Sequence, residues 1–311
     1  MTLIKIKYII VWIYYCLITG CAKRDGRTEI FVEIIKNKKY DEERAFYGSV
    51  GANLSECAFD GPADGESAFK EARDVTVSDC FFNLRYPFWH DTGVKISASE
   101  LTENCRAALW YSRGIEIRDS KLHGIKALRE CSDILIEGSD IISPEFGWFS
   151  SDIRMKDCSA SGEYFMMRSR SLNFDRVTLH GKYSFQYVEN SVFENCDFDT
   201  KDAFWHSKNV TVRNSRIKGE YLAWYAEDLT LENCEIIGTQ PLCYCKGLKL
   251  INCSMTGCDL SFEKSFVTAS LNSHVDSIKN PIEGSITLPS VGEIIDEYNT
   301  KCKIEVTKCR V

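Results

Sequence analysis

Proline, basic runs and low-complexity tracts are scarce or absent in this sequence. Only six prolines occur in 311 residues, and no low-complexity tract interrupts the chain, which argues against long linkers and disorder. The formal net charge is −7, and Lys and Arg form no long run. Because affinity for phosphates depends mostly on Lys and Arg, we expect no nucleic-acid partner.

The short motifs of common enzyme classes are also missing. The sequence has no Walker loop, no Rossmann fingerprint, no Gly-x-Ser-x-Gly elbow and no His-Glu-x-x-His zinc helix. We therefore expect no bound cofactor, and the sequence leaves open whether the protein is an enzyme.

Cysteine, in contrast, is abundant. The chain has fifteen cysteines, but their spacing is not that of a small disulfide scaffold, and a chain of this length does not need one. Cys243 and Cys245 form a Cys-x-Cys pair, which is a weak zinc signal. Free Cys behaves as a small buried hydrophobe, so we expect buried thiols, no metal site and a reducing compartment.

The dominant feature is a repeat. One seven-residue pattern consists of a turn residue, an apolar–polar–apolar triplet, two polar residues and a small residue. It recurs at residues 74–80, 114–120, 152–158, 209–215, 228–234 and 247–253, with Ile251 as the one exception at a polar position. The small residue recurs ten times from Cys80 to Cys253, and eight of the nine intervals are nineteen residues long. Strand-like alternation in such strict register predicts an all-β fold, a single-stranded right-handed parallel β-helix (solenoid) of about 10–11 coils of ~19 residues.

Most columns of this repeat are explained by packing. Apolar pairs such as Val75/Val77 and Leu229/Leu231 should face the core. The residue before the small position is Asn in four successive coils, at Asn195, Asn214, Asn233 and Asn252. This column predicts a ladder of hydrogen-bonded side-chain amides. Residues 32–60 and 265–306 are predicted to form irregular end coils and caps, which protect the open strand edges.

Two neighbouring columns are not explained so simply. The first holds Trp89, Trp110, Arg129, Trp148, Met167, Gln186, Trp205, Trp224 and Cys243. The second holds His90, Tyr111, Glu130, Phe149, Arg168, Tyr187, His206, Tyr225 and Tyr244. We expect one of the two to face outward as a stripe. Aromatic residues that fill a wide coil are one interpretation, and a cleft for extended polar ligands such as sugar chains is the other.

The ligand-binding residues predicted from these columns are Trp89, Trp110, Arg129, Trp148, Gln186, Tyr187, Trp205, Trp224 and Tyr225. Carboxylates border the columns, among them Glu145, Glu163 and Glu220. Two carboxyls within reach across adjacent coils can act as general acid and base, although solvated turn residues are the simpler interpretation. The weak catalytic candidates are His90, Asp91, Glu130, Arg168, Asp202 and His206.

Several longer motifs resemble a known family. These motifs are GPADGESA (61–68), LRYPFWHD (84–91), CRAALWYS (105–112), GIKALREC (124–131), SPEFGW (143–148), EYFMMRS (163–169), EYLAWY (220–225) and GTQPLCYC (238–245). They are similar to motifs of the bacterial domain-of-unknown-function family DUF3737, which has a pectin-lyase-like β-helix. The resemblance covers roughly residues 32–306 and implies the fold, but it brings no activity and no catalytic residues.

The N-terminus carries a conflicting signal. An apolar stretch at residues 8–19, too short for a confident membrane span, is followed by Gly20-Cys21, which looks like a lipoprotein cleavage site. Family members typically begin with a Met before a stretch like residues 33–44, and Val32 takes that place here. The resemblance thus implies an extension over residues 1–31, a β-helix domain over residues 32–306 and a tail over residues 307–311. We expect a cytoplasmic protein, with lipid anchoring to a membrane at Cys21 as the alternative.

Two functions follow from these observations. The first is a β-helix that binds or modifies a glycan or another extended polar ligand along the stripe, and it rests partly on analogy of fold. The second is a non-enzymatic scaffold or protein-binding β-helix. An open groove with two neighbouring carboxyls favours the enzyme, and a filled aromatic wall favours the scaffold. The sequence does not determine the ligand or the oligomeric state.

Overall fold

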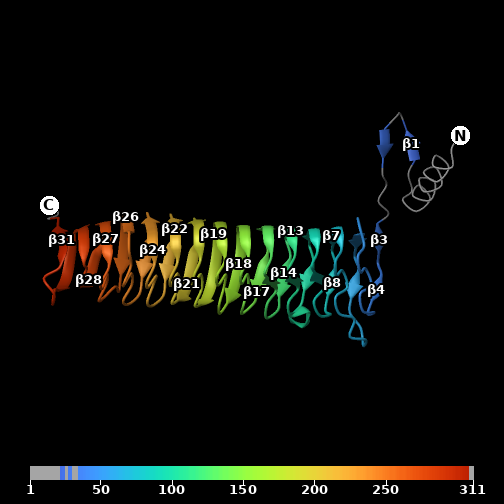
Figure 1. Cartoon of the computed structure of the whole chain (residues 1–311), viewed down its shortest axis with the longest axis horizontal. Coiled ribbons are helices and arrows are strands. Elements are labelled where there is room, and N and C mark those ends of the chain that lie inside the picture. The colour runs from blue at the N-terminus through green and yellow to red at the C-terminus, as the bar shows by residue number, and fades with distance from the viewer. Residues whose placement is uncertain (1–21, 25–26, 30–33, 308–311) are drawn as a thin grey trace, which may run out of the picture.

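Parallel strands stacked along one axis form a rod-shaped solenoid (Figure 1). The computed structural model describes residues 22–24, 27–29 and 34–307. The predictions about residues 8–19 and Cys21 lie outside these residues. Within the described part of the chain, no helix is long and apolar enough to span a bilayer.

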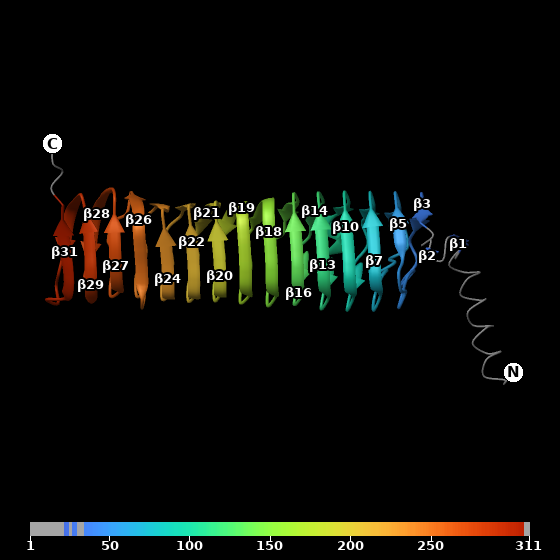
Figure 2. The same ribbon diagram turned by 90° about the horizontal axis from the view of Figure 1, so that it is seen from above.

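One strand from each coil builds the principal ladder, whose members lie side by side in Figure 2. Its strands are β3 (Ile35–Lys36), β5 (Asn53–Ser55), β7 (Arg73–Ser78), β10 (Thr92–Ser97), β13 (Arg113–Arg118), β16 (Ser132–Glu137), β18 (Ser151–Gly162), β19 (Arg170–Lys182), β20 (Glu189–Glu194), β22 (Lys208–Arg213), β24 (Glu227–Glu232), β26 (Leu248–Thr256), β27 (Phe266–Leu271), β29 (Glu283–Leu288) and β31 (Lys301–Val306).

A second ladder follows the first after a short turn. It contains β4 (Lys39–Tyr40), β6 (Ala58–Phe59), β8 (Phe81–Phe82), β11 (Glu100–Leu101), β14 (Lys121–His123), β17 (Asp140–Ile142), the ends of β18 and β19, β21 (Asp197–Lys201), β23 (Arg216–Lys218), β25 (Glu235–Ile237) and the end of β26. The remaining elements are β1 (Ala22–Arg24), β2 (Arg27–Glu29), β9 (Phe88–Trp89), β12 (Leu109–Trp110), β15 (Leu128–Arg129), β28 (His274–Lys279), β30 (Ser290–Ile295) and the 3₁₀ turn η1 (Glu103–Cys105).

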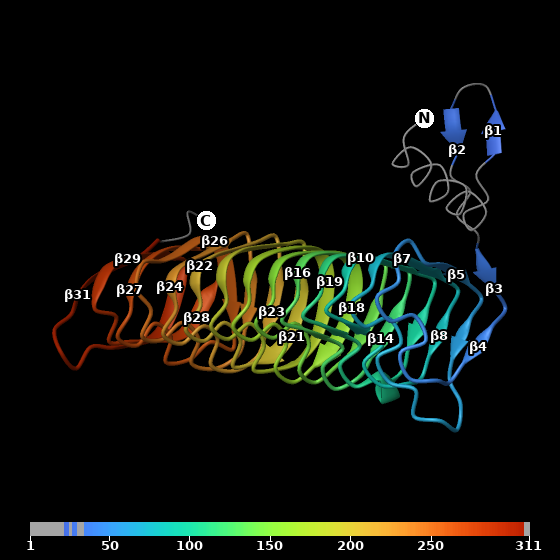
Figure 3. The same ribbon diagram turned by 45° about the vertical axis from the view of Figure 1, so that its right-hand side comes forward.

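The register confirms the predicted columns. Ile134 pairs with Ile153 and Val210 pairs with Leu229, each nineteen residues apart. Because each coil repeats the outline of its neighbour (Figure 3), like residues stack along the axis and the apolar columns are fully buried. The predicted parallel β-solenoid is therefore confirmed.

The solenoid has about 14 coils rather than 10 or 11. The additional coils come from the two end segments, where strands such as β3 and β31 continue the principal ladder. Coil length varies there, since Phe266 pairs with Glu283 seventeen residues on, and Glu283 pairs with Lys301 eighteen residues on. This variation hides the repeat in the sequence but does not interrupt the strand pairing.

The turn between the two ladders explains two residue preferences. The residue before the small position has a left-handed backbone in every coil from Asp79 (φ 54°) to Asn252 (φ 52°), which favours Asn, Asp and Gly there. The small residue is buried, and where it is Ser its hydroxyl accepts the backbone N–H of the previous coil, as Ser215 Oγ does from Cys196 at 3.0 Å. Every described cysteine is free, and all but Cys302 are buried.

The predicted amide ladder is present in part. Asn233 Nδ2 donates to Asn214 Oδ1 at 3.2 Å, and Asn252 Nδ2 donates to Asn233 Oδ1 at 2.9 Å. The ladder continues to Asn272, whereas Asn195 donates to Asp175 instead. These amides are exposed, so the ladder occupies the outside of the corner.

Candidate binding surface

The two mixed columns lie on the turn that closes each coil, and both reach the surface. Side chains of the first column, which we call the tryptophan column, are half-buried apart from the buried Cys243. The second column is exposed or half-buried in every coil, and we call it the outer ladder. We expected one column to face outward, but the turn is wide enough to present both.

Rings of the outer ladder stack on one another along the rod. Tyr187, His206, Tyr225 and Tyr244 form a continuous pile with centroid distances of 4.9, 5.0 and 4.8 Å and interplanar angles of at most 12°. The guanidinium of Arg168 covers the other face of Tyr187 at 4.4 Å. Earlier in the chain His90 stacks on Tyr111 at 5.0 Å.

The stacking also explains bulky residues in an unfavourable backbone conformation. Each outer-ladder residue has a positive φ, from 51° at Glu130 to 62° at His90. This conformation costs a bulky residue on the order of 1–2 kcal/mol. A stacked aromatic pair contributes about 0.5–1.5 kcal/mol beyond its buried area, so the pile offsets much of that cost.

Four side chains of the tryptophan column connect their coil to the next one through side-chain N–H groups. The indole N–H of Trp148, Trp205 and Trp224 donates to the backbone carbonyl sixteen residues further on, at Tyr164, Tyr221 and Gln240. Gln186 makes the equivalent bond to the carbonyl of Asp202 at 3.3 Å. Trp89 and Trp110 stack on each other at 5.6 Å, but their buried indole nitrogens have no partner among the described residues.

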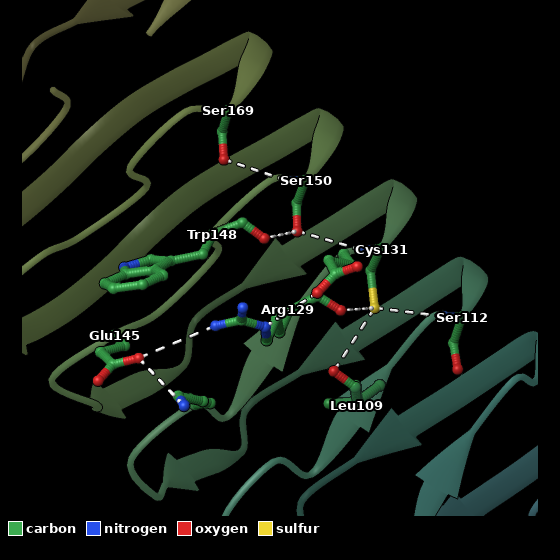
Figure 4. A network of polar contacts seen from close by, with 10 residues as sticks. Leu109, Ser112, Arg129, Cys131, Glu145, Trp148, Ser150 and Ser169 are labelled. Atoms are coloured by element: carbon green, nitrogen blue, oxygen red, sulfur yellow. Dashed lines mark hydrogen bonds and ion pairs between the residues drawn. The ribbon is translucent and has the colours of Figure 1, made fainter. Parts of the chain in front are cut away.

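Arg129 replaces tryptophan in one coil and organises an ionic network (Figure 4). Its guanidinium pairs with Glu130 at 3.0 Å, lies 3.9 Å from Glu145 and sits over the Trp148 ring at 5.4 Å. Lys126 pairs with Glu145 at 3.4 Å. The carboxylates of Glu130 and Glu145, which border the columns, are therefore engaged in ion pairs.

Behind the outer ladder runs a buried column of small polar residues, also drawn in Figure 4. Ser150 accepts the N–H of Cys131 at 3.1 Å, and Ser169 accepts the N–H of Ser150 at 3.2 Å. Asp91 occupies the same column, where its Oδ1 accepts the N–H of Ala72 at 2.9 Å. Burial raises the pKa of Asp91 to about 8.

The catalytic candidates do not converge on one point. His90 is exposed while Asp91 is buried behind it, so the two side chains lie on opposite sides of the wall. Asp91 and Asp202 are separated by six coils, which is on the order of 30 Å along the axis. Glu130 pairs with Arg129, Arg168 covers Tyr187 and His206 is stacked between two tyrosines. Burial raises the pKa of Asp202, and the nearby Glu220 carboxylate adds to this shift, but Glu220 is held in an ion pair with Lys201 at 2.7 Å.

Ring faces of the outer ladder are mostly occupied by neighbouring rings. Sugars stack on exposed aromatic faces, whereas this pile presents ring edges, hydroxyls and imidazole nitrogens. The arrangement thus corresponds to the filled aromatic wall. The residues predicted to bind a ligand are gathered on one surface, at the turn that closes each coil.

A trough that no predicted site residue indicates lies elsewhere on the coils. Two adjoining hollows of about 530 and 460 Å³ share Ile142 and Pro144 in their walls. Together they cross five successive coils at residues 100–103, 123–125, 142–144, 161–163 and 180–182. We call this feature the trough, and its length is on the order of 20 Å.

Glycine forms the floor of the trough. Gly124, Gly162 and Gly181 line it, and a Cβ on Gly181 would lie 1.9 Å from the carbonyl oxygen of Gly162. No side chain fits between coils that approach so closely. The column continues at Gly219 and Gly238, so glycines at multiples of nineteen residues are the sequence signal that could have revealed the trough.

Charged and apolar side chains form the walls. Ile125 and Ile142 are 48% and 50% exposed, next to the half-buried His123. Glu163 pairs with Lys182 at 2.6 Å across adjacent coils. The lining contains three carboxylates, those of Glu100, Glu103 and Glu163, and one ammonium group, that of Lys182. Lys121, which does not line the trough, pairs with Glu100 at 3.6 Å.

Fold and surface together define a parallel β-solenoid that carries an aromatic ladder on its turns and an open trough across its coils. Residues 33–309 match the family described as protein of unknown function (DUF3737), and the chain belongs to that family. A search among curated proteins gives no match.

Solved structures with similar folds are distant. Tailspike protein 3 of bacteriophage CBA120 is 11% identical with a TM-score of 0.31, over 89% of this chain and 50% of the tailspike. QnrB1, a plasmid-mediated fluoroquinolone resistance protein, is 13% identical with a TM-score of 0.19, over 70% of this chain and 89% of its own. ORF18 of Geobacillus virus E2 is 10% identical with a TM-score of 0.22, over 76% of this chain and 52% of the ORF18 chain. At these values the likeness concerns the fold alone.

Proposed function

We propose that this protein is a non-catalytic β-helix that binds a neutral glycan chain along the trough. The observation that carries the proposal is the continuity of the trough over five coils, since an extended ligand needs an extended site. Its axis follows the rod, so successive sugars would lie on successive coils.

The walls offer both kinds of contact that a sugar makes. Ile125 and Ile142 present apolar surface to the C–H face of a pyranose. The exposed His180, together with Glu163 and Lys182, presents donors and acceptors to hydroxyl groups. This combination suits a neutral carbohydrate better than a purely apolar ligand.

The balance of charge argues against a polyanion. The three carboxylates outnumber the ammonium groups of Lys182 and Lys121, and like charges repel an approaching uronate or phosphate polymer. We therefore expect neutral polysaccharides to bind and polyuronates to bind weakly or not at all.

Binding without catalysis is supported by the same residues. Glycoside hydrolysis commonly uses two carboxyl groups, one on each side of the scissile bond. In the trough Glu163 is paired with Lys182 and Glu100 with Lys121, which leaves Glu103 without an ion pair among the described residues. We therefore expect a retained ligand and no release of reducing ends.

A thermal-shift screen of the full chain against neutral oligosaccharides and oligouronates tests the proposal. Ser161→Trp fills the trough, and Thr178→Trp places the same side chain on an exposed neighbouring position outside it. We expect a neutral oligosaccharide to raise the melting temperature of the unsubstituted protein and of Thr178→Trp, but not of Ser161→Trp.

Two results would contradict this function. If Tyr225→Ala or Trp205→Ala abolishes the shift while Ser161→Trp retains it, the ligand lies on the outer ladder or tryptophan column. If no oligosaccharide shifts the protein, the glycan proposal fails and the non-enzymatic protein scaffold becomes the better interpretation of the aromatic wall.

A further inference from the structure

A separate hollow of about 690 Å³ lies at the C-terminal end of the rod. It is bordered by the first residues of β27, β29 and β31, which are neighbouring strands at the orange and red end of Figure 2. The loop that precedes β31, residues 298–300, forms another wall of the hollow. Neither the trough nor the outer ladder contributes to this hollow.

The loop at residues 298–300 is held in place by a buried side chain that binds the residue before it. Asn280 is 1% exposed, and its Oδ1 accepts the backbone N–H of Glu297 at 2.8 Å. Its Nδ2 donates to the Glu297 carboxylate at 2.9 Å. Asp296 accepts the N–H of Thr300 at 3.0 Å, which closes the loop on itself. The hollow is thus preorganised, and a ligand pays little entropy to order it.

Large apolar side chains are exposed around the hollow. Phe266 is 40% exposed, Ile282 is 36% exposed and Tyr298 is 65% exposed, although most large apolar residues in the described part of the chain are buried. Three such side chains around one space form a site for a flat ring. The volume lies in the range of small-molecule sites.

The charges around the hollow select the ligand. Lys264 and Lys301 have no ion pair among the described residues, whereas Lys208 pairs with Glu227 and Lys279 pairs with Glu263. Glu283 is the one carboxylate among the lining residues, and the Glu297 carboxylate accepts a hydrogen bond from Asn280, so the two ammonium groups outnumber the one carboxylate that the lining presents to a ligand. An anionic group on the ligand would complete the balance.

We propose that this hollow binds a planar aromatic molecule with one negative charge. The ring lies among Phe266, Ile282 and Tyr298, and the anionic group reaches Lys264 or Lys301. The site is independent of glycan binding, because none of its residues lies in the trough.

A fluorescence titration of the full chain with 8-anilinonaphthalene-1-sulfonate, an aromatic monoanion, tests this site. We expect saturation at one equivalent. Tyr298→Ala and Lys264→Glu should each weaken binding about tenfold, through loss of ring contact and of charge attraction. The matched variants Tyr47→Ala and Lys95→Glu change an exposed tyrosine and an exposed lysine that line neither this hollow nor the trough, and should stay within about twofold of the unsubstituted protein.

The neutral probe N-phenyl-1-naphthylamine separates charge from ring contact and should bind about tenfold more weakly than the sulfonate. Circular dichroism checks that every variant is folded. Absent binding, several equivalent sites, equal affinity for the two probes, or equal affinity of Tyr298→Ala and Tyr47→Ala would overturn the proposal.

Discussion

Trp205 and Trp224 stack one coil apart, with ring centroids 5.3 Å apart and planes within 3° of parallel. Each indole N–H donates to a carbonyl in the following coil, at 2.6 Å for Trp205 and 2.8 Å for Trp224. The pair therefore stabilises both the stacking of coils and the conformation of the turn. This structural task accounts for the tryptophan column without any ligand.

The indole bonds can be tested by removing one N–H group. Trp205→Phe keeps a ring but loses the donor to Tyr221, so we expect a loss of about 1 kcal/mol in the free energy of unfolding. Trp110→Phe is the matched control, because Trp110 Nε1 has no partner among the described residues. Urea denaturation of both variants measures the difference, and equal losses would contradict a role for the hydrogen bond.

Asp91 should make stability depend on pH. Burial raises its pKa to about 8, above the value of about 3.9 for an unfolded Asp, so between these values the unfolded chain binds fewer protons. Stability then falls as pH rises from about 4 to 8. Asp91→Asn removes this contribution and should be more stable than the unsubstituted protein at pH 8 by an amount on the order of a few kcal/mol.

Thermal or urea denaturation at several pH values isolates this effect as the difference between the two proteins. Other titrating groups contribute equally to both. A difference that does not change between pH 5 and pH 8 would show that Asp91 does not hold its proton in the folded state.

The buried thiols should be protected from modification. Burial raises the pKa of Cys131 and of Cys245 to about 12, and the thiolate is the reactive form. Among the described cysteines, we expect iodoacetamide at pH 8 to label Cys302 first, because it alone is partly exposed. Peptide mapping should find the others labelled only in denaturant, and fast native labelling of Cys131 would argue against the stacked core.

The glycine floor predicts a steric effect. Gly181→Ala would place its Cβ 1.9 Å from the Gly162 oxygen, so the coils must separate and we expect a loss of more than about 3 kcal/mol. Gly257→Ala meets no atom within 4 Å but has a φ of +61°, so its cost should be about 1 kcal/mol. Thermal denaturation compares the two, and a larger loss for Gly257→Ala would refute close packing at the floor.

Much of this molecule was already determined by its sequence. Alternation within each strand and a nineteen-residue period assigned Val75, Leu229 and the small column from Cys80 to Cys253 to the core, because periodic burial requires periodic residues. The aromatic residues at the turn were found as columns for the same reason.

Tertiary structure alone decided what those columns do. A column in the sequence does not show whether a ring presents its face or its edge, and stacking of His206 between Tyr187 and Tyr225 depends on the spacing of neighbouring coils. The trough arises because side chains are missing at Gly162 and Gly181, and a hollow depends on the walls around it. The hollow beside Tyr298 needs a loop pinned by Asn280, a contact between segments whose shortened coils erase the repeat.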